Sequence, residues 1–278
     1  MPPSPKRKSD SQTVDTSSSS NQSKKARLDN TSTSATAMTA TNGNKVLNGT
    51  ATTTPPPDSH INPTAALAYW SSTAPTVDGV LGGYPQVSRI DLQGGANFLA
   101  RLRLKSKHHP PGPKLRRAAD CGAGIGRITT GFLAKVAETV DVIEPVREFT
   151  DVLESGKGGV GEIVNLGLED WEPEPETQYD LIWNQWCVGQ LPDAALVSYL
   201  RRLPKALAQG GWIVVKENLS NHHLGEDVYD ETDSSVTRTD EKFQKLFREA
   251  GMKIVASEIQ RGMPKELYEV RSYALQPV

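Results

Sequence analysis

Three glycines and a later acid are the residues of this chain with the clearest chemistry. The glycines lie in Asp120-Cys121-Gly122-Ala123-Gly124-Ile125-Gly126-Arg127, and Glu144 follows the strand-like run Val140-Asp141-Val142-Ile143. A Gly-x-Gly-x-Gly turn lets the backbone approach a ligand closely, and the helix that follows offers free N–H groups to it. The Glu144 carboxylate can accept hydrogen bonds from both hydroxyls of a ribose. These residues therefore predict a nucleotide-cofactor site.

Such a site needs a sheet to position it, because open α/β sheets bind ligands beyond the carboxyl ends of their strands. From residue 115 strand and helix patterns alternate, which predicts a parallel sheet covered on both faces. We expect strands at 115–120, 140–144, 162–166, 179–183 and 212–217, helices at 64–70, 88–104, 125–136, 147–154, 194–207 and 239–250, and a glycine-rich loop at 76–84. Two final β-rich runs, 252–259 and 267–275, predict an antiparallel hairpin.

The first 58 residues differ sharply in composition from the rest of this 278-residue chain. They hold hardly any large apolar side chain, so nothing there offsets the entropy lost on ordering. We expect residues 1–58 to be a disordered tail and residues 60–278 to form one domain. The basic clusters Lys6-Arg7-Lys8 and Lys24-Lys25-Ala26-Arg27 fit a bipartite signal read by a nuclear import receptor, which predicts location in the nucleus and cytoplasm. A merely solubilising tail is the alternative.

Charge and cysteine content argue against several classes of partner. The net charge is −2, so no chain-wide basic field indicates direct contact with nucleic acid. Cys121 and Cys187 lie inside apolar runs and not in a spaced framework, so neither disulfides nor a metal site is expected. No apolar run approaches the roughly 20 residues that span a bilayer, and no secretory signal is recognisable. We therefore expect no membrane partner.

The position of the third glycine distinguishes between cofactors. Dinucleotide sites prefer Gly-x-Gly-x-x-Gly, whereas Gly126 comes one residue early and Asp120 precedes the turn. The run 120–126 instead resembles the first motif of class I S-adenosylmethionine-dependent methyltransferases. That resemblance implies S-adenosyl-L-methionine as cofactor and an α/β, Rossmann-like seven-stranded sheet with an antiparallel last strand, here with an N-terminal helical extension. A nicotinamide-dependent oxidoreductase and a ligand-free turn are the alternatives.

The same resemblance implies which residues hold the cofactor. Arg127 would pair with the methionine carboxylate, Gln185 would lie near the methionine moiety, and Leu168, Glu169 and Asp170 would lie near adenine. The predicted cofactor-binding residues are Gly122, Gly124, Arg127, Glu144, Pro145, Leu168, Glu169 and Gln185. Without the resemblance, Glu169 and Asp170 are ordinary loop acids, Gln185 is a strand-end cap and Arg127 is a solvated helix residue.

Several short runs between residues 63 and 275 indicate the methyl acceptor. They are Tyr69-Trp70, the run 75–84, the run 120–129, Ile182-Trp183, Gln185-Trp186, Val188-Gly189, Lys216-Glu217-Asn218 and the run 233–236. Together they resemble the protein α-N-terminal methyltransferases, which methylate the α-amine of proteins that expose X-Pro-Lys/Arg after removal of the initiator methionine. Nucleobase amino methyltransferases usually carry Asp/Asn-Pro-Pro-aromatic after the fourth strand, where this chain has Asn184-Gln185-Trp186-Cys187. A nucleobase acceptor is therefore disfavoured.

This second resemblance implies a role for each residue of the acceptor site. Asp233 would be the general base, and Asp230 and Asp233 would both face the cation of the third substrate residue. Trp186 would stack on the substrate proline, Asn218 would bond the first residue, and Trp70 would help close the site. The predicted catalytic residues are Asp233, Asp230 and Asn218, and the predicted substrate-binding residues are Trp70, Leu81, Trp186, Asn218, Asp230, Asp233 and Tyr268. Without the resemblance, the tryptophans are core residues, Asn218 is a cap, the acids belong to loops and Tyr268 is structural.

Two departures from the family's pattern bear on the chemistry. Gln190 stands where the family commonly has a histidine thought to assist deprotonation, and a glutamine cannot take up a proton. More of the deprotonation then falls on Asp233. The loop 219–232 is also longer than in close relatives, and its His222 and His223 are candidates to compensate. A methyltransferase fold with another acceptor, or a non-catalytic cofactor-binding scaffold, is the alternative.

Overall fold

The computed structural model describes residues 55–278. Both predicted import-signal clusters, and all but the last four residues of the predicted tail, lie outside the described residues. Near its start the described chain forms a turn of 3-10 helix, Pro57–His60, where the Asp58 carboxylate accepts the Asp193 backbone N–H at 3.0 Å. Within the described residues, no helix has the length and apolar character needed to cross a membrane.

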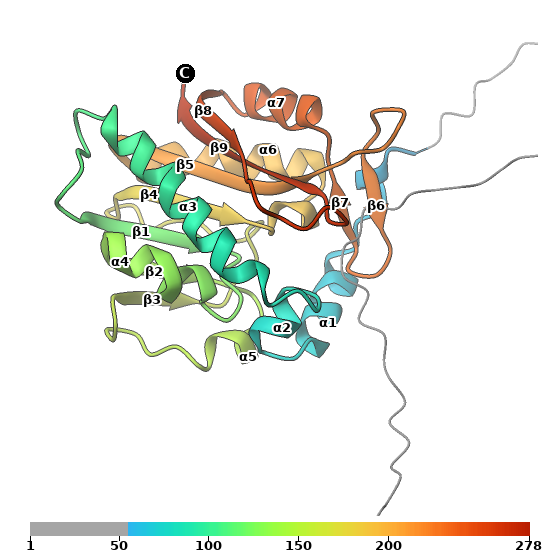
Figure 1. The fold of residues 1–278 in the computed structure, drawn as a ribbon, viewed down its shortest axis with the longest axis horizontal. Coiled ribbons are helices and arrows are strands. Elements are labelled where there is room, and N and C mark those ends of the chain that lie inside the picture. Colours follow the sequence, from blue (N-terminus) through green and yellow to red (C-terminus); the bar gives the residue numbers. More distant parts are fainter. Residues whose placement is uncertain (1–54) are drawn as a thin grey trace, which may run out of the picture.

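A seven-stranded sheet forms the centre of the fold (Figure 1). Its strands are β1 (Leu115–Cys121), β2 (Ala137–Ile143), β3 (Val160–Val164), β4 (Tyr179–Gln185), β5 (Leu207–Leu219), β8 (Met252–Ile259) and β9 (Glu269–Pro277), in the order β3-β2-β1-β4-β5-β9-β8. The first five strands pair in parallel, and β9 is antiparallel to both β5 and β8. The predicted sheet with a reversed last strand and a closing hairpin is confirmed.

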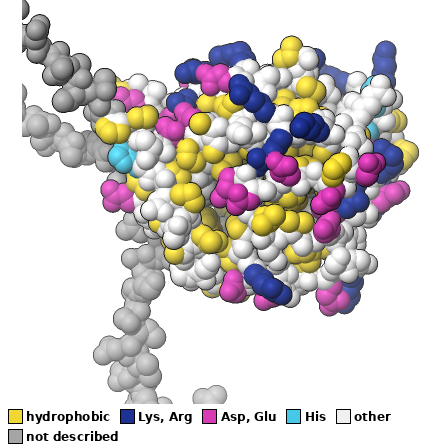
Figure 2. All heavy atoms as spheres, turned by 180° about the vertical axis from the view of Figure 1, so that it is seen from behind, with side chains coloured by type: hydrophobic (Ala, Val, Ile, Leu, Met, Phe, Trp, Pro, Cys, Tyr) yellow, Lys and Arg dark blue, Asp and Glu magenta, His cyan; other side chains and the backbone are white. Residues whose placement is uncertain are grey.

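Helices cover both faces of the sheet because successive strand residues point to opposite sides. On β4, Leu181 and Trp183 pack with α3 (Val87–Leu104), whereas Ile182 packs with α6 (Asp193–Arg202) and α7 (Asp240–Glu249). Figure 1 shows α3 in front of the sheet and α6 and α7 behind it. The surface on the α6 and α7 side carries acidic and basic side chains intermixed with hydrophobic ones (Figure 2).

Several predicted local structures were wrong in type or extent; the expected helix 194–207, for example, is helical only to Arg202 and continues as a 3-10 turn, Leu203–Ala206. The expected loop 76–84 contains the short helix α2 (Val77–Val80), because the Thr76 hydroxyl accepts the Gly79 N–H at 3.1 Å. The expected helix 125–136 contains a π-helical segment, Thr129–Leu133, before α4 (Ala134–Val136). The expected helix 147–154 is only α5 (Arg147–Thr150). The segment 219–232 is not a loop throughout. Its first residue, Leu219, ends β5, and Val228–Asp230 form β6, which pairs with β7 (Ser235–Thr237).

The N-terminal helices and the β6–β7 hairpin meet beyond the carboxyl ends of the parallel strands, at the right of Figure 1. Asn62 joins them: its side chain caps α1 (Pro63–Ser72) by accepting the Ala65 N–H at 3.1 Å, and its own N–H donates to Ser234 Oγ at 2.8 Å. This contact connects segments 172 residues apart. It therefore joins the N-terminal segment to the hairpin at the end of the sheet where the glycine turn lies.

Candidate functional site

Two neighbouring pockets open at this end of the sheet and share a wall. The glycine-turn pocket, of about 360 Å³, is bordered by Gly122, Gly124 and Glu144. The acidic pocket, of about 120 Å³, is bordered by Asp230 and Asp233. The residues that line both are Trp70, Val80, Leu81, Trp186 and Gln190. The two pockets therefore adjoin one another along these residues.

The structure brings together the residues predicted for each of the two sites, with the exception of Asp170. The glycine-turn pocket is lined by all the predicted cofactor-binding residues, Gly122, Gly124, Arg127, Glu144, Pro145, Leu168, Glu169 and Gln185. The acidic pocket is lined by all the predicted acceptor-site residues, Trp70, Leu81, Trp186, Asn218, Asp230, Asp233 and Tyr268. His222 and His223, the candidates to compensate for the missing histidine, line neither pocket. Asp170 also lines neither.

The glycine turn has the geometry that close approach of a ligand requires. Gly122, Gly124 and Gly126 have φ values of 66°, 55° and 72°, a region that L-residues with a side chain rarely adopt. A Cβ built on Gly124 would meet only Val80 Cγ1, at 4.0 Å. The backbone at Gly124 is therefore open to the pocket.

Glu144 is held rigidly beside this turn. Its Oε2 accepts the Gly124 N–H at 2.8 Å and its Oε1 accepts the Val146 N–H at 2.9 Å. Burial raises the pKa of Glu144, while these two hydrogen bonds oppose the rise. Each oxygen keeps a lone pair, since a carboxylate has about four acceptor sites. The site therefore fits the two hydroxyls of a ribose.

Arg127 and Gln185 reach the glycine-turn pocket as members of a buried polar cluster that the sequence did not reveal. Arg127 NH1 donates to Asp91 Oδ2 at 2.7 Å, and Gln185 Nε2 lies 2.9 Å from both Asp91 oxygens. Lys216 Nζ donates to Asp91 Oδ1 at 2.5 Å. The interpretation of Arg127 as a solvated residue was wrong, because its side chain is only 9% exposed. The available signal was Lys216 itself, a lysine inside an apolar strand.

Asp233 lies in the turn of the β6–β7 hairpin, almost fully buried. Its Oδ1 accepts the Ser235 hydroxyl at 2.6 Å, and Gln190 Nε2 approaches its Oδ2 at 3.5 Å. Ser234, next to it, has a positive φ of 52°. A non-glycine residue in this region costs about 1–3 kcal/mol, and such strain is often found at functional sites. The hairpin thus fixes the orientation of the Asp233 carboxylate.

A third carboxylate, Glu217 on β5, also lines the acidic pocket and was missed by the sequence reasoning. Its Oε1 accepts the N–H groups of Cys187 and Val188, at 2.8 and 3.0 Å. Among the described residues, no lysine, arginine or histidine lines this pocket. Three carboxylates without a lining cation favour a positively charged ligand.

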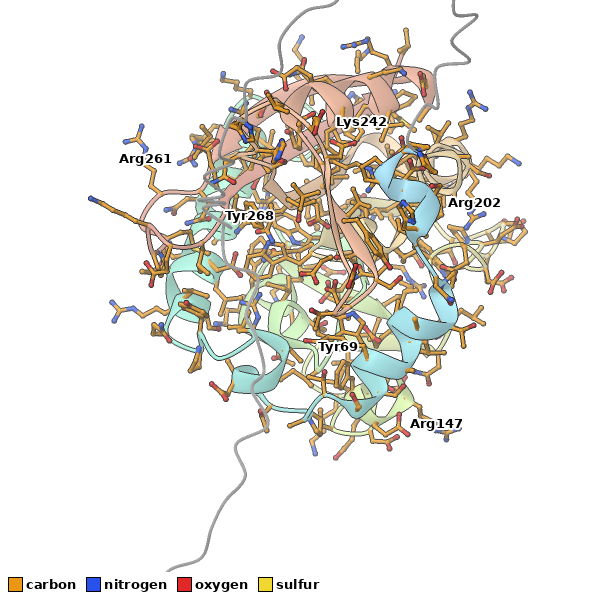
Figure 3. The ribbon with its side chains drawn as sticks, turned by 90° about the vertical axis from the view of Figure 1, so that its right-hand side faces the viewer. Tyr69, Arg147, Arg202, Lys242, Arg261 and Tyr268 are labelled. Carbon is orange, nitrogen blue, oxygen red and sulfur yellow. The ribbon has the colours of Figure 1, made fainter. Side chains whose placement is uncertain are left out.

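Aromatic side chains enclose the acidic pocket. Trp186 has a positive φ of 54° and its ring lies 5.5 Å from the Arg127 guanidinium. Tyr69 and Trp70 pack edge to face with centroids 5.1 Å apart. Figure 3 looks onto this end of the molecule, with Tyr69 and Tyr268 toward the middle and Arg147 and Arg261 at the periphery. The lining of this pocket therefore combines carboxylates with aromatic side chains.

The family of AdoMet-dependent proline di-methyltransferases matches residues 58–276. The chain belongs to this family. It is therefore an AdoMet-dependent methyltransferase. The predicted cofactor and enzyme class are confirmed, and the assignment stands against the alternatives of an oxidoreductase and a non-catalytic scaffold. Within the described part of the chain, no group of three or more His, Cys, Asp or Glu side chains is placed to hold a metal ion.

Individual relatives agree with this assignment. The chain is 42% identical over 217 residues to alpha N-terminal protein methyltransferase 1 of Schizosaccharomyces pombe, covering 76% of this chain and 94% of the relative. It is 39% identical over 214 residues to N-terminal Xaa-Pro-Lys N-methyltransferase 1-A of Xenopus laevis, covering 76% and 93%. A SAM-dependent methyltransferase from Leishmania major superposes with a TM-score of 0.69 at 36% identity, covering 77% of this chain and 82% of that one.

Proposed function

We propose that this chain methylates the α-amino group of proteins that expose X-Pro-Lys or X-Pro-Arg after the initiator methionine is removed. The observation that carries the proposal is the acidic pocket, with Glu217, Asp230 and Asp233 in its lining, directly beside the cofactor pocket. A protein N-terminus of this type brings two positive charges, one on the α-amine and one on the third residue. The names of the Schizosaccharomyces and Xenopus relatives support the same class of substrate.

The residues of the glycine-turn pocket fit S-adenosyl-L-methionine. Glu144 would hold the ribose, Arg127 the methionine carboxylate, and Leu168 with Glu169 the adenine. The bound cofactor supplies a methyl group on a positively charged sulfur, which needs an acceptor with a free lone pair in line with it. Positioning therefore accounts for most of what the protein must do.

Asp233 would prepare the acceptor by taking up its proton. The α-amine has a pKa of about 7.7–8.0, so it is mostly protonated at neutral pH and needs a modest base. The carboxylates of the acidic pocket attract the ammonium form but also raise its pKa, so removing the proton depends on a base in contact with the amine. With its proton on Asp233, the amine nitrogen would have a free lone pair positioned to accept the methyl group that the bound cofactor would supply.

The other acceptor residues would fix the peptide in register. Trp186 would stack on the second-position proline, and Asn218 would bond the first residue. Asp230, half-buried and braced by the Thr232 N–H at 2.9 Å, would face the third-residue cation. Leu81, Trp70 and Tyr268 would enclose the bound N-terminus.

Peptide methylation with labelled cofactor tests this proposal. A Pro-Pro-Lys peptide should be labelled on its α-nitrogen. The same peptide acetylated at its N-terminus should be unlabelled, and a Pro-Pro-Gln peptide should show a raised KM. Label on the lysine side chain, or equal labelling of the acetylated peptide, would contradict the proposal.

The basic clusters before residue 28 support a second, independent proposal, namely binding to a nuclear import receptor and a location in nucleus and cytoplasm. Six Lys or Arg side chains in two groups match the charge pattern of such a signal. Replacing Lys6, Arg7 and Lys8 by alanine in a fluorescent fusion should move protein from nucleus to cytoplasm. An unchanged distribution would count against it.

A further inference from the structure

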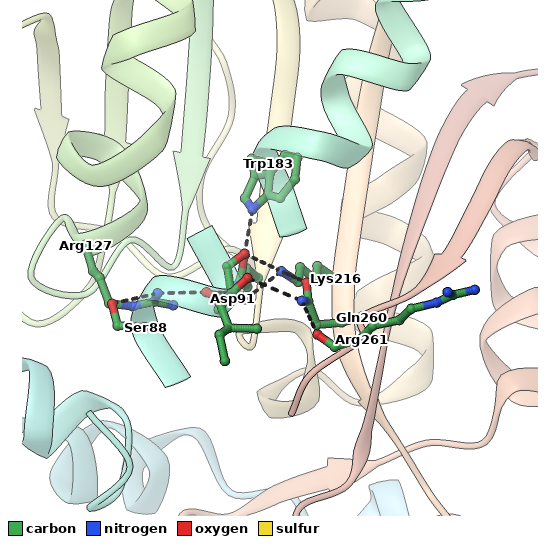
Figure 4. Close-up of polar contacts among 9 residues, drawn as sticks. Ser88, Asp91, Arg127, Trp183, Lys216, Gln260 and Arg261 are labelled. Carbon is green, nitrogen blue, oxygen red and sulfur yellow. Dashed lines mark hydrogen bonds and ion pairs between the residues drawn. The ribbon is translucent and has the colours of Figure 1, made fainter. Parts of the chain in front are cut away.

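A buried cluster of charged and polar side chains lies next to the glycine-turn pocket and is centred on Asp91 of α3 (Figure 4). The Asp91 side chain is 0% exposed. It accepts hydrogen bonds from Arg127, Lys216 and Gln185, at 2.7, 2.5 and 2.9 Å. Two of these three partners, Arg127 and Gln185, also line the glycine-turn pocket. Asp91 itself lines neither pocket.

We propose that Asp91 is a positioning residue that fixes Arg127 and Gln185 toward the methionine end of the bound cofactor. An arginine side chain has many rotamers, and holding one of them costs conformational entropy. Asp91 accepts a hydrogen bond from NH1 of the Arg127 guanidinium. The N–H groups on the other guanidinium nitrogens are then left to bind a ligand in the glycine-turn pocket. The proposal rests on the cofactor and not on the proposed acceptor.

The charges of the cluster support this role. Burial alone would raise the pKa of Asp91, but attraction to Lys216 and Arg127 outweighs burial and lowers it, so the carboxylate is charged. Burial lowers the pKa of Lys216, while the charge of Asp91 opposes that change. The charged Asp91 therefore holds Arg127 by an ion pair as well as by a hydrogen bond.

Lys216 has partners that keep it away from the pocket. Its ammonium donates to the Asp91 backbone carbonyl and to Gln260 Oε1, both at 3.1 Å, besides the Asp91 carboxylate. Gln260 in turn donates to the Arg261 carbonyl at 2.9 Å. Lys216 therefore faces α3 and the β8–β9 connection, and Arg127 is the cation of this cluster that borders the pocket.

Binding of two cofactor fragments separates positioning from a general structural role. S-adenosylhomocysteine carries the amino-acid carboxylate, whereas 5′-methylthioadenosine lacks it. By calorimetry, Asp91→Asn should weaken S-adenosylhomocysteine about 10- to 100-fold, the range of a hydrogen bond to a charged group, and change methylthioadenosine much less. Asp141→Asn is the matched control, because Asp141 is also buried and paired with an arginine, Arg117, at 2.7 Å, but lines neither pocket. It should leave the ratio of the two affinities unchanged.

A double variant keeps the test decisive if Asp91→Asn alone leaves Lys216 unpaired and fails to fold. Asp91→Asn with Lys216→Met removes one charge of each sign and preserves the net charge of the cluster. The affinity for S-adenosylhomocysteine relative to that for 5′-methylthioadenosine should still fall, because Asp91 no longer holds Arg127. Equal losses for both ligands, or an unchanged ratio in the double variant, would overturn the positioning role. Neither measurement uses an acceptor, so a failure here is distinct from a failure of the proposed substrate.

Discussion

Gln190 Nε2 lies 3.5 Å from Asp233 Oδ2, and Gln190 lines both the glycine-turn pocket and the acidic pocket. A glutamine at this point can orient the carboxylate but cannot take up a proton. Gln190→His should therefore add a second base and raise kcat a few-fold above pH ~6.5, where a histidine is neutral. Rates measured from pH 6 to 9 check this. Gln190→Leu, which adds no base, should not raise kcat, and an unchanged profile in the histidine variant would contradict the reasoning.

Asp233→Asn should lower kcat by about 100-fold or more, the usual contribution of a general base. The amide preserves the shape and can still accept the Ser235 hydroxyl, so cofactor affinity should stay within about twofold. Steady-state kinetics and cofactor binding measure the two effects separately. Glu231→Gln is the control, since Glu231 is an exposed carboxylate of the same hairpin that does not line the pocket. Parallel losses of turnover and cofactor affinity would show that Asp233 is structural.

Glu144→Gln should weaken cofactor binding about 10- to 100-fold. Its two oxygens accept the Gly124 and Val146 N–H groups, and an amide would turn an NH₂ toward one of these donors. A buried donor without an acceptor costs about 1–3 kcal/mol. Equilibrium binding of S-adenosylhomocysteine is the measurement. Glu148→Gln, at a nearby exposed position outside the pocket, should bind normally, and equal affinities in both variants would exclude the ribose role of Glu144.

The sequence predicts the sheet and the cofactor pocket well because both depend on local patterns. Runs rich in β-branched residues, such as 140–143, define strands, and Gly122, Gly124 and Gly126 require a tight turn at the end of one of them. The carboxyl ends of parallel strands necessarily meet, so the order of the strands along the chain is enough to place Glu144 beside that turn.

Contacts over long sequence separations could not be predicted in the same way. Asp91 and Lys216 are 125 residues apart, and each taken alone resembles an ordinary charged residue. The β6–β7 hairpin has strands of only three residues, too short for a period-two pattern, so Asp233 was assigned through resemblance and not through local structure. The π-helical segment Thr129–Leu133 depends likewise on packing, with Phe132 against Trp183.

Gly122→Ala should destabilise the fold more than Gly156→Ala. Both glycines have positive φ values, 66° and 78°, so each substitution costs about 1–2 kcal/mol of backbone strain. A Cβ on Gly122 would also overlap the Cβ of Cys187, whereas nothing lies within 4 Å of one on Gly156. Overpacking of this kind typically adds about 1–3 kcal/mol. Denaturant unfolding of both variants gives the comparison, and equal losses would mean that Cys187 moves aside freely.

Asp120→Asn should change how stability depends on pH. Burial raises the pKa of Asp120 from 3.8 to about 7, although the Thr129 hydroxyl, donating at 2.6 Å, opposes the rise. The folded protein then keeps the Asp120 proton up to about pH 7, while the unfolded chain releases it near pH 4. The contribution of Asp120 is therefore full below pH 4 and is lost as the pH rises through 7.

Asparagine does not titrate, so this loss should disappear in the variant. The free energy of unfolding of Asp120→Asn minus that of the parent should be roughly 2–3 kcal/mol larger at pH 8 than at pH 5, so the variant gains relative stability as the pH rises. Using the difference between variant and parent cancels the titration of the other carboxylates, and omitting cofactor removes ligand effects. Urea unfolding at half-unit pH steps provides the data. A difference that is constant, or that grows toward low pH, would mean that Asp120 is ionised in the folded protein throughout this range.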